Sequence, residues 1–184
     1  MITKFDYFYG GHVEMENMGF QGLRVDDRLE SDEHLASVFD EARAIAQLMA
    51  PLNFDTLWLA EHHFQREGYG GIPNIPMLSV YLAQITERLK FGPAVMVLPG
   101  RNPVLCAKAL ASLDRISNGR ALPAFGLGIA DNAEQQAFGV KRSERAAWFD
   151  EALPLIRRLW TEDVVDHHGE RFSLNGVRIL PKPV

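Results

Sequence analysis

Short apolar runs alternate along the chain with longer segments in which apolar residues recur every three or four positions. Four such runs, each predicted to be a β-strand, lie at residues 5–9, 54–60, 89–98 and 121–129. The periodic segments predict helices at residues 31–49, 77–88, 104–116 and 146–160. The last part, residues 164–183, is expected to form a β-hairpin with its turn at Asn175 and Gly176.

Strand and helix alternate at intervals of about 30–35 residues, which is typical of βαβ units and a parallel sheet. Ser31 is the expected N-cap of the first helix, Pro51 follows its end, and Gly119 is the expected left-handed residue after the third. The fold class is therefore α/β. A Rossmann sheet and a (β/α)8 barrel both fit this pattern. The glycines at 126 and 128 do not decide between them, because Asp131 replaces the third glycine of a dinucleotide fingerprint.

Composition and charge exclude several classes of protein. The chain has 184 residues, of which 47% are hydrophobic and 23% charged, as in a globular protein. A net charge of −5 without a basic block argues against nucleic-acid binding, and the single cysteine, Cys106, excludes a disulfide framework. The longest charge-free apolar stretch, residues 121–130, has half the length of a membrane-spanning helix. We therefore expect a cytoplasmic protein without a membrane or nucleic-acid partner.

The most informative polar residues are Glu61, His62 and His63, which follow the second apolar run directly. In parallel α/β folds the carboxyl ends of strands are where ligands bind, and histidine exchanges protons near neutral pH. Adjacent strand residues point to opposite faces, so the two histidines do not suit one metal ion, and no metal site is expected. A second pair, His167 and His168, is expected to be solvated in the hairpin. A structural role for His62 fits this spacing as well as a catalytic one.

Residues 54–64, FDTLWLAEHHF, closely resemble the second-strand motif of the bacterial-luciferase-like, flavin-dependent monooxygenases. Further segments resemble motifs of this family in the same order: residues 91–99, 102–104 with 113–120, 136–140, 159–163 and 180–183. The resemblance covers nearly the whole chain. It implies a TIM-type barrel with reduced FMN at its C-terminal face and molecular oxygen as a reactant.

The resemblance also implies roles for individual residues. His62 is expected beside the isoalloxazine ring, as a base or as the group that stabilises an oxygenated flavin, with His63 as a second catalytic residue. Glu61, Ala94, Val95 and Gly128 are the expected cofactor-binding residues. The Ala94–Val95 peptide is expected to be cis, which costs about 3–4 kcal/mol and persists only where the surrounding structure enforces it.

Two departures from the family pattern matter. The fourth strand ends at Gly128 and Ile129, without the reactive cysteine and adjacent arginine of true luciferase, so light emission is not expected. The part up to Lys90 looks like the FMN-using branch, whereas the part from Gly100 onward looks like relatives that use a deazaflavin coenzyme. FMN is thus the expected cofactor and a deazaflavin the alternative.

The chain is shorter than the family requires, because a complete barrel of this kind needs about 250 residues. Residues 1–184 are therefore interpreted as a single, incomplete luciferase-like domain with strands one to four and a hairpin at 164–183. It is either a fragment or a half-barrel that must assemble as a homo-oligomer. Candidates for its uncovered inner face include the following apolar strand residues: Leu57, Leu59, Val95, Val97, Phe125 and Leu127.

The expected function is that of a flavin-dependent monooxygenase acting on a small organic substrate with reduced flavin and oxygen. Its expected partners are that substrate and a separate NAD(P)H:flavin reductase. A deazaflavin-dependent dehydrogenase, which transfers hydride without oxygen, is the alternative enzyme. A non-catalytic flavin-binding half-barrel is the alternative from another class.

Overall fold

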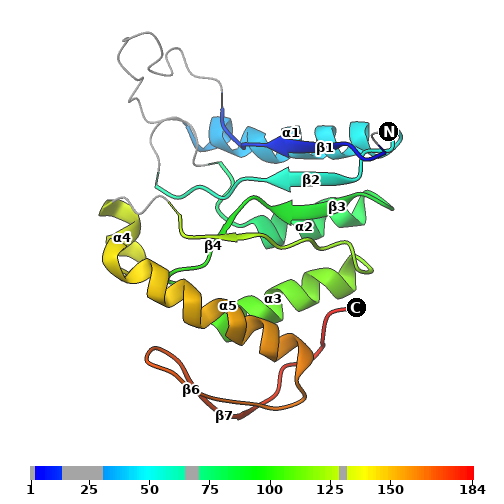
Figure 1. Ribbon diagram of the computed structural model, residues 1–184. Coiled ribbons are helices and arrows are strands. Elements are labelled where there is room, and N and C mark those ends of the chain that lie inside the picture. Colours follow the sequence, from blue (N-terminus) through cyan, green and yellow to red (C-terminus); the bar gives the residue numbers. More distant parts are fainter. Residues whose placement is uncertain (1–2, 14–30, 65–70, 129–131) are drawn as a thin grey trace. The chain divides into compact units, whose positions relative to one another are not determined.

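The structure is a computed structural model that describes residues 3–13, 31–64, 71–128 and 132–184 (Figure 1). The chain forms two compact units, residues 1–94 and residues 95–184. The predicted end of the fourth strand at Ile129, and Asp131 in the glycine motif, lie outside the described residues.

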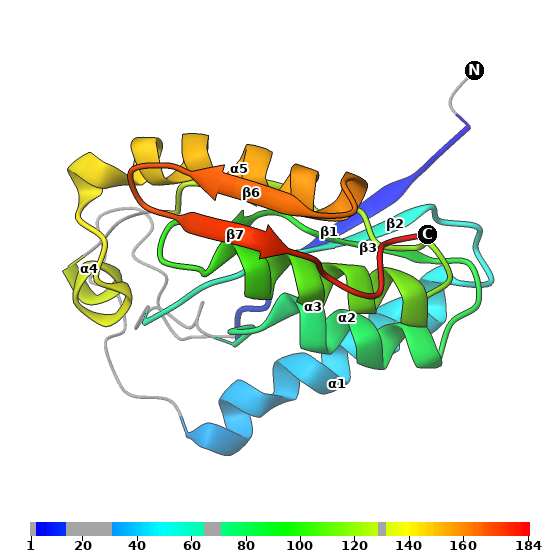
Figure 2. The same cartoon turned by 90° about the horizontal axis from the view of Figure 1, so that it is seen from below.

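The described residues of the first unit form a parallel three-stranded sheet with two helices. Its elements are β1 (Asp6–Tyr9), α1 (Asp32–Met49), β2 (Thr56–Leu59), α2 (Ile75–Gln84) and β3 (Lys90–Pro93). β2 lies between β1 and β3, with Tyr7 beside Leu57 and Leu57 beside Phe91. Figures 1 and 2 show both helices on one side of this sheet. The predicted βα units are confirmed here.

Side-chain caps set the start of both helices. Ser31 Oγ accepts a hydrogen bond from the His34 N–H at 3.1 Å, which confirms the predicted N-cap of α1. Asn74 Oδ1 accepts from the Met77 N–H at 3.1 Å, so α2 begins before the predicted residue 77. α1 ends at Met49, just before Pro51, as predicted.

The core of the first unit lies between the sheet and the helices. Leu57, Leu59 and Phe91 are fully buried in one cluster with side chains of both helices, including Val38 and Leu82. Leu57 and Leu59 are thus part of the helix-facing core and do not contribute to an uncovered inner face. The sequence did not predict this because every position of residues 57–60 is apolar, so alternation cannot assign a face.

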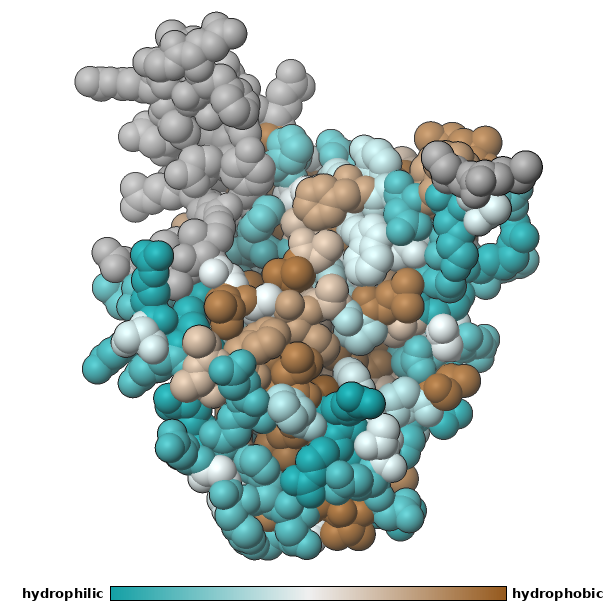
Figure 3. Space-filling view, in the orientation of Figure 1, coloured by the Kyte–Doolittle hydropathy of each residue, from teal (hydrophilic) through white to brown (hydrophobic). Residues whose placement is uncertain are grey.

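The opposite face of this sheet carries aromatic side chains. Tyr9 donates its hydroxyl hydrogen to Glu41 Oε2 of α1 at 2.6 Å, so strand alternation turns Phe8 away from the helices. Phe8 lies beside Trp58 in the register and is 57% exposed. Trp58 Nε1 donates to Asp6 Oδ2 at 3.1 Å across the two strands. Apolar surface is also visible in the space-filling view, where it is brown (Figure 3).

The second unit begins with a second, short parallel pair of strands. Its elements are β4 (Met96–Val97), α3 (Pro103–Ile116), β5 (Phe125–Gly126), α4 (Asn132–Phe138), the 3-10 turn η2 (Arg142–Glu144) and α5 (Arg145–Thr161). β4 pairs with β5, Met96 beside Phe125. The apolar run predicted as one strand at 89–98 is therefore two strands, β3 and β4, that belong to different sheets. After α3, Gly119 has φ +77°, so the predicted left-handed residue is confirmed.

The C-terminal hairpin is confirmed, but its predicted turn is wrong. It consists of β6 (Val165–His168) and β7 (Ser173–Val177), paired antiparallel. Asn175 and Gly176 lie inside β7, where the Gly176 N–H donates to Asp166 Oδ1 at 2.6 Å. The turn lies at residues 169–172, because Gly169 donates to the Phe172 carbonyl and Glu151 of α5 binds the turn.

Glu151 attaches the hairpin to α5. Its carboxylate accepts hydrogen bonds from the backbone N–H groups of Arg171 and Phe172, at 3.1 and 2.9 Å, and lies 3.0 Å from His167 Nε2. His167 is therefore bound and partly buried, which contradicts its expected solvation, whereas His168 is exposed. Burial alone would raise the pKa of Glu151, but these hydrogen bonds hold it below its ordinary value.

We expect Glu151→Gln to lower the free energy of unfolding by about 1 kcal/mol at pH 7, because a neutral amide accepts weaker hydrogen bonds. The lowered pKa means that the carboxylate stabilises the fold above its unfolded-state pKa, about 4.3. That contribution is lost as the pH falls through the folded-state pKa, so the difference between variant and wild type should vanish at an acidic pH below that pKa. Urea unfolding at both pH values measures it, with exposed Glu170→Gln as control. A pH-independent difference would contradict this assignment.

None of the helices in the part of the chain that the structure describes is long and apolar enough to cross a membrane.

Candidate functional site

The carboxyl ends of β1, β2 and β3 lie at one edge of the first sheet, since all three strands are parallel. Two backbone hydrogen bonds extend the pairing just past the strands: Ala60 N–H to the Tyr9 carbonyl at 3.1 Å, and Ala94 N–H to the Leu59 carbonyl at 2.7 Å. Ala60 and Ala94 are therefore neighbours of β1 and β2 at this edge. We call it the strand-end edge of the first unit.

Glu61 and His63 form a close pair at the strand-end edge. His63 Nε2 lies 2.9 Å from Glu61 Oε1, and their side chains are 11% and 0% exposed. An ionised carboxylate only accepts hydrogen bonds, so a neutral His63 paired with it carries its proton on Nε2. His62, between them, is half-buried, and its backbone N–H donates to the Ile72 carbonyl at 3.4 Å. The structure thus places the three predicted residues together at the end of β2.

The backbone leaves the strand-end edge in an unusual conformation. Phe64, directly after His63, has φ +60°, a left-handed value that costs a residue other than glycine about 1–2 kcal/mol. Its ring centroid is 5.9 Å from that of His63, and its side chain is 52% exposed. Such strain persists where the surrounding structure enforces it, which is common at functional sites.

Tight packing joins the loops that follow β1 and β2. Gly11 has φ +65°, and a Cβ added to it would collide with the Ile72 side chain. A Cβ at Gly71 would lie 2.7 Å from the Gly11 carbonyl oxygen and 2.6 Å from Val38. Glycine at both positions therefore lets the two loops pack closely. The Ile72 carbonyl in the second loop accepts the hydrogen bond from the backbone N–H of His62.

Tyr9, at the end of β1, is a polar group that the sequence analysis missed. Burial raises the pKa of its hydroxyl, and the hydrogen bond to Glu41 raises it further. Tyr9 is therefore a fixed donor that attaches β1 to α1. Its partner lies in the next helix and shares no motif with it, so no sequence signal indicates the pair.

The expected flavin platform at Ala94 and Val95 lies where β3 ends and β4 begins. Leu180–Pro181 is the single cis peptide bond among the described residues, so the Ala94–Val95 bond is trans and the expectation of a cis bond is wrong. The resemblance alone led to that expectation, against the strong intrinsic preference of non-proline bonds for trans. Ala94 is partly buried and Val95 is 38% exposed.

In the second unit, Gly128 follows β5 in a crowded environment. Arg145, the first residue of α5, donates from Nη1 to the Leu127 carbonyl at 2.6 Å and from Nη2 to Glu134 Oε2 at 2.7 Å. The side chains of Arg145 and Glu134 are 3% and 5% exposed. Gly128 could be named from the sequence, whereas this ion pair, which joins α4 and α5, could not.

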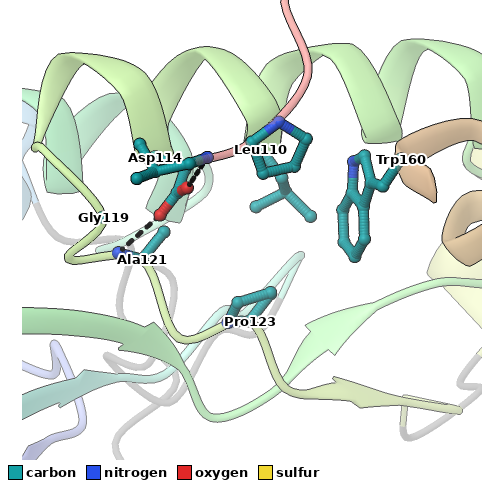
Figure 4. A pocket seen from close by; sticks show the side chains of 8 residues that line it. Leu110, Asp114, Gly119, Ala121, Pro123 and Trp160 are labelled. Carbon is teal, nitrogen blue, oxygen red and sulfur yellow. Dashed lines mark hydrogen bonds between the residues drawn. The ribbon is translucent and has the colours of Figure 1, made fainter.

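A separate pocket of about 340 Å³ lies at the opposite end of β5 (Figure 4). Its lining is mostly apolar and includes Leu110, Pro123 and Trp160. Asp114 also faces it, but its two oxygens already accept the backbone N–H groups of Ala121 and Val184, at 3.3 and 2.8 Å. Ala121 and Pro123 at this pocket directly precede β5, so it lies away from the strand end that carries Gly128.

The chain is similar to proteins with two kinds of coenzyme chemistry. A family model described as luciferase-like monooxygenase matches residues 18–184. The alkanal monooxygenase alpha chain of Photorhabdus luminescens is 31% identical over 140 residues, 74% of this chain and 37% of that protein. The F420-dependent glucose-6-phosphate dehydrogenase of Kineococcus radiotolerans is 32% identical over 135 residues, 70% of this chain and 39% of that protein.

Solved structures agree with the sequence matches. The oxygenating constituent of 3,6-diketocamphane monooxygenase from Pseudomonas putida, in complex with FMN, matches with a TM-score of 0.76 at 20% identity. The match covers 95% of this chain and 44% of that one. The chain thus spans less than half the length of these three relatives. Its fold is that of luciferase-like TIM-type barrels over about half their length, with parallel βα units and an antiparallel hairpin. The chain belongs to the luciferase-like monooxygenase family.

Proposed function

We propose that this chain carries part of the active site of a flavin-dependent monooxygenase that acts on a small organic substrate. The observation that supports it best is the proton-active group at the end of β2: half-buried His62 between the paired Glu61 and His63. Parallel α/β folds bind ligands at this end of their strands. A flavin monooxygenase needs such a group because its reaction releases water and therefore moves protons.

The residues at the strand-end edge suit a flat, partly polar ring. Ala60 and Ala94, at the ends of β2 and β3, have the smallest side chains next to glycine; Ala60 is buried and Ala94 is half-buried. Glu61, His62 and His63 follow directly and add polar groups to this apolar strand end. An apolar surface with a few placed polar groups is the usual form of a cofactor site.

Each residue has a distinct proposed role. Reduced FMN, when bound, supplies two electrons with which oxygen is divided between the product and water. His62 gives or takes a proton at an imidazole nitrogen. Glu61 lies 2.9 Å from His63 Nε2 and so fixes the orientation of the His63 ring beside His62. Ala94, Val95 and Gly128 are proposed as coenzyme contacts.

An F420-dependent dehydrogenase is the second candidate, supported by the similarity to F420-dependent glucose-6-phosphate dehydrogenase. Such an enzyme would transfer hydride from its substrate to the deazaflavin without oxygen. For the monooxygenase we further propose a cytoplasmic location, a separate NAD(P)H:flavin reductase as the source of reduced flavin, and a homo-oligomeric assembly.

Coenzyme binding distinguishes the two candidates. The purified protein is analysed for co-purified flavin and then titrated with FMN and with F420, each followed by fluorescence. We expect FMN to bind, and oxygen uptake with reduced FMN to increase with a member of a panel of small aldehydes and ketones. Preference for F420 with oxygen-independent oxidation of an alcohol would favour the dehydrogenase. Binding of neither coenzyme would contradict both.

A further inference from the structure

The buried ion pair of Arg145 and Glu134 lies at the carboxyl end of β5. Arg145 is 2% exposed and Glu134 is 4% exposed. The guanidinium donates from one nitrogen to the Leu127 carbonyl and from another to the carboxylate, at 2.6 and 2.7 Å. One side chain thus joins the start of α5 to both the end of β5 and α4.

Gly128 has no side chain that would collide with this guanidinium. It has φ +74°, and a Cβ added to it would lie 2.7 Å from Arg145 Nη1 and 2.8 Å from Val97 Cγ1. The space that a side chain would need at position 128 is therefore occupied by Arg145 on one side and by β4 on the other. Arg145 contacts the backbone of Leu127 and restricts the backbone of Gly128.

Stability alone does not explain a buried pair at this place. Removing two charges from water is costly, and replacing a buried pair by apolar residues is often neutral or stabilising. The Nε of Arg145 is also buried and has no hydrogen-bond acceptor among the described residues, which adds to the free-energy cost of burying the side chain. What the pair achieves that apolar residues could not is a fixed backbone at the end of β5.

We propose that Arg145 and Glu134 are positioning residues for coenzyme binding. They hold Leu127 and Gly128 in the conformation in which the end of β5 contacts the flavin-type coenzyme. This inference rests on the proposed function, because it takes the end of β5 as part of the coenzyme site. Arg145 supplies the hydrogen bond to Leu127, and Glu134 fixes the guanidinium in the orientation that allows it.

Two variants separate positioning from stability. Arg145→Met leaves Glu134 charged and buried, so it should lower both the thermal midpoint and the affinity for FMN. The double variant Glu134→Met with Arg145→Met leaves no unpaired charge and should regain the thermal midpoint. Its affinity for FMN should remain at least tenfold below wild type, because Leu127 still lacks its donor. A double variant that binds FMN as wild type does would overturn the proposal.

Arg158→Met is the matched control. Arg158 lies in the same helix and binds Glu162 through two nitrogens, at 2.8 and 3.0 Å, but this pair is half-exposed and near the other end of α5. Its FMN affinity should change less than twofold. The same titrations are made with F420, the coenzyme of the alternative function, and read in the same way.

Hydrogen exchange in a peptide containing Leu127 and Gly128 gives a readout without coenzyme. Exchange should be at least tenfold faster in the double variant than in wild type and unchanged in Arg158→Met. If the wild type binds neither coenzyme, the proposed function fails, and the positioning role in coenzyme binding fails with it. If the wild type binds but the double variant neither exchanges faster nor binds more weakly, only the positioning role fails.

Discussion

Replacing His62 by alanine is expected to lower turnover by about 100-fold or more in the active holoenzyme, since removal of a proton-transfer group typically costs 10²–10⁴-fold. His62 follows β2 directly and is half-buried beside the Glu61–His63 pair. Turnover is measured as coupled oxygen uptake and product formation at saturating reduced FMN. The thermal midpoint of the variant should stay close to that of wild type.

His63→Ala is the matched control, one residue along the same segment. We expect a smaller loss of turnover, because His63 Nε2 is already engaged by Glu61 and the proton transfer is assigned to His62. Wild-type turnover in His62→Ala would contradict the catalytic assignment. Loss of folding in that variant would instead indicate a structural histidine, and His62→Gln, which keeps a polar side chain, would then separate the two roles.

The second large effect that we expect is self-association of the 184-residue chain. β1 is an edge strand of its sheet, and Phe8 on it is 57% exposed. In the second unit, Val95 and Leu127 are 38% and 44% exposed. Burying each such side chain is worth roughly 1.5–3 kcal/mol, which is large beside a domain stability of about 5–15 kcal/mol. An open strand edge adds unpaired backbone groups that favour pairing with a second chain.

Sedimentation velocity at micromolar concentration measures the association. Wild type should sediment as dimers or larger species, and Phe8→Ser should shift the distribution towards monomer. Leu48→Ser is the matched control, because Leu48 is 64% exposed but lies on helix α1 and not on a strand. A compact, stable wild-type monomer that binds FMN tightly would be incompatible with this expectation.

The sequence predicted those parts of the fold that depend on neighbouring residues. The cap at Ser31 and the left-handed Gly119 were predicted correctly because each is decided within a few positions. The hairpin turn was predicted wrongly because Glu151, from another element, binds residues 171 and 172 and so fixes the turn there. The division of residues 89–98 into two strands was not predicted either, since apolar residues lie on both sides of Gly92 and Pro93 and were interpreted as one run.

In the candidate site, too, residues that are adjacent in sequence could be predicted, whereas pairs formed by tertiary packing could not. Glu61, His62 and His63 could be named from the sequence because they are adjacent and follow a strand. The Glu134–Arg145 pair could not, because its members lie in two helices and only packing brings them together at the end of β5. Tyr9 and Glu41 are farther apart still. Polar residues that are adjacent in a sequence can be identified from it, whereas pairs of distant residues can be identified only in the folded structure.

The register of β1 has a consequence for synthesis on the ribosome. Asp6 pairs with Thr56, and among the described residues β2 is the one partner strand of β1. Nascent chains grow at about 5–20 residues per second, so Phe5 and Phe8 leave the exit tunnel several seconds before their partner strand does. The C-terminal hairpin differs, because its paired residues Val165 and Val177 are close in sequence. Its two strands therefore leave the exit tunnel almost together. Nascent β1 is therefore expected to expose Phe5 and Phe8 for seconds before it can pair with β2.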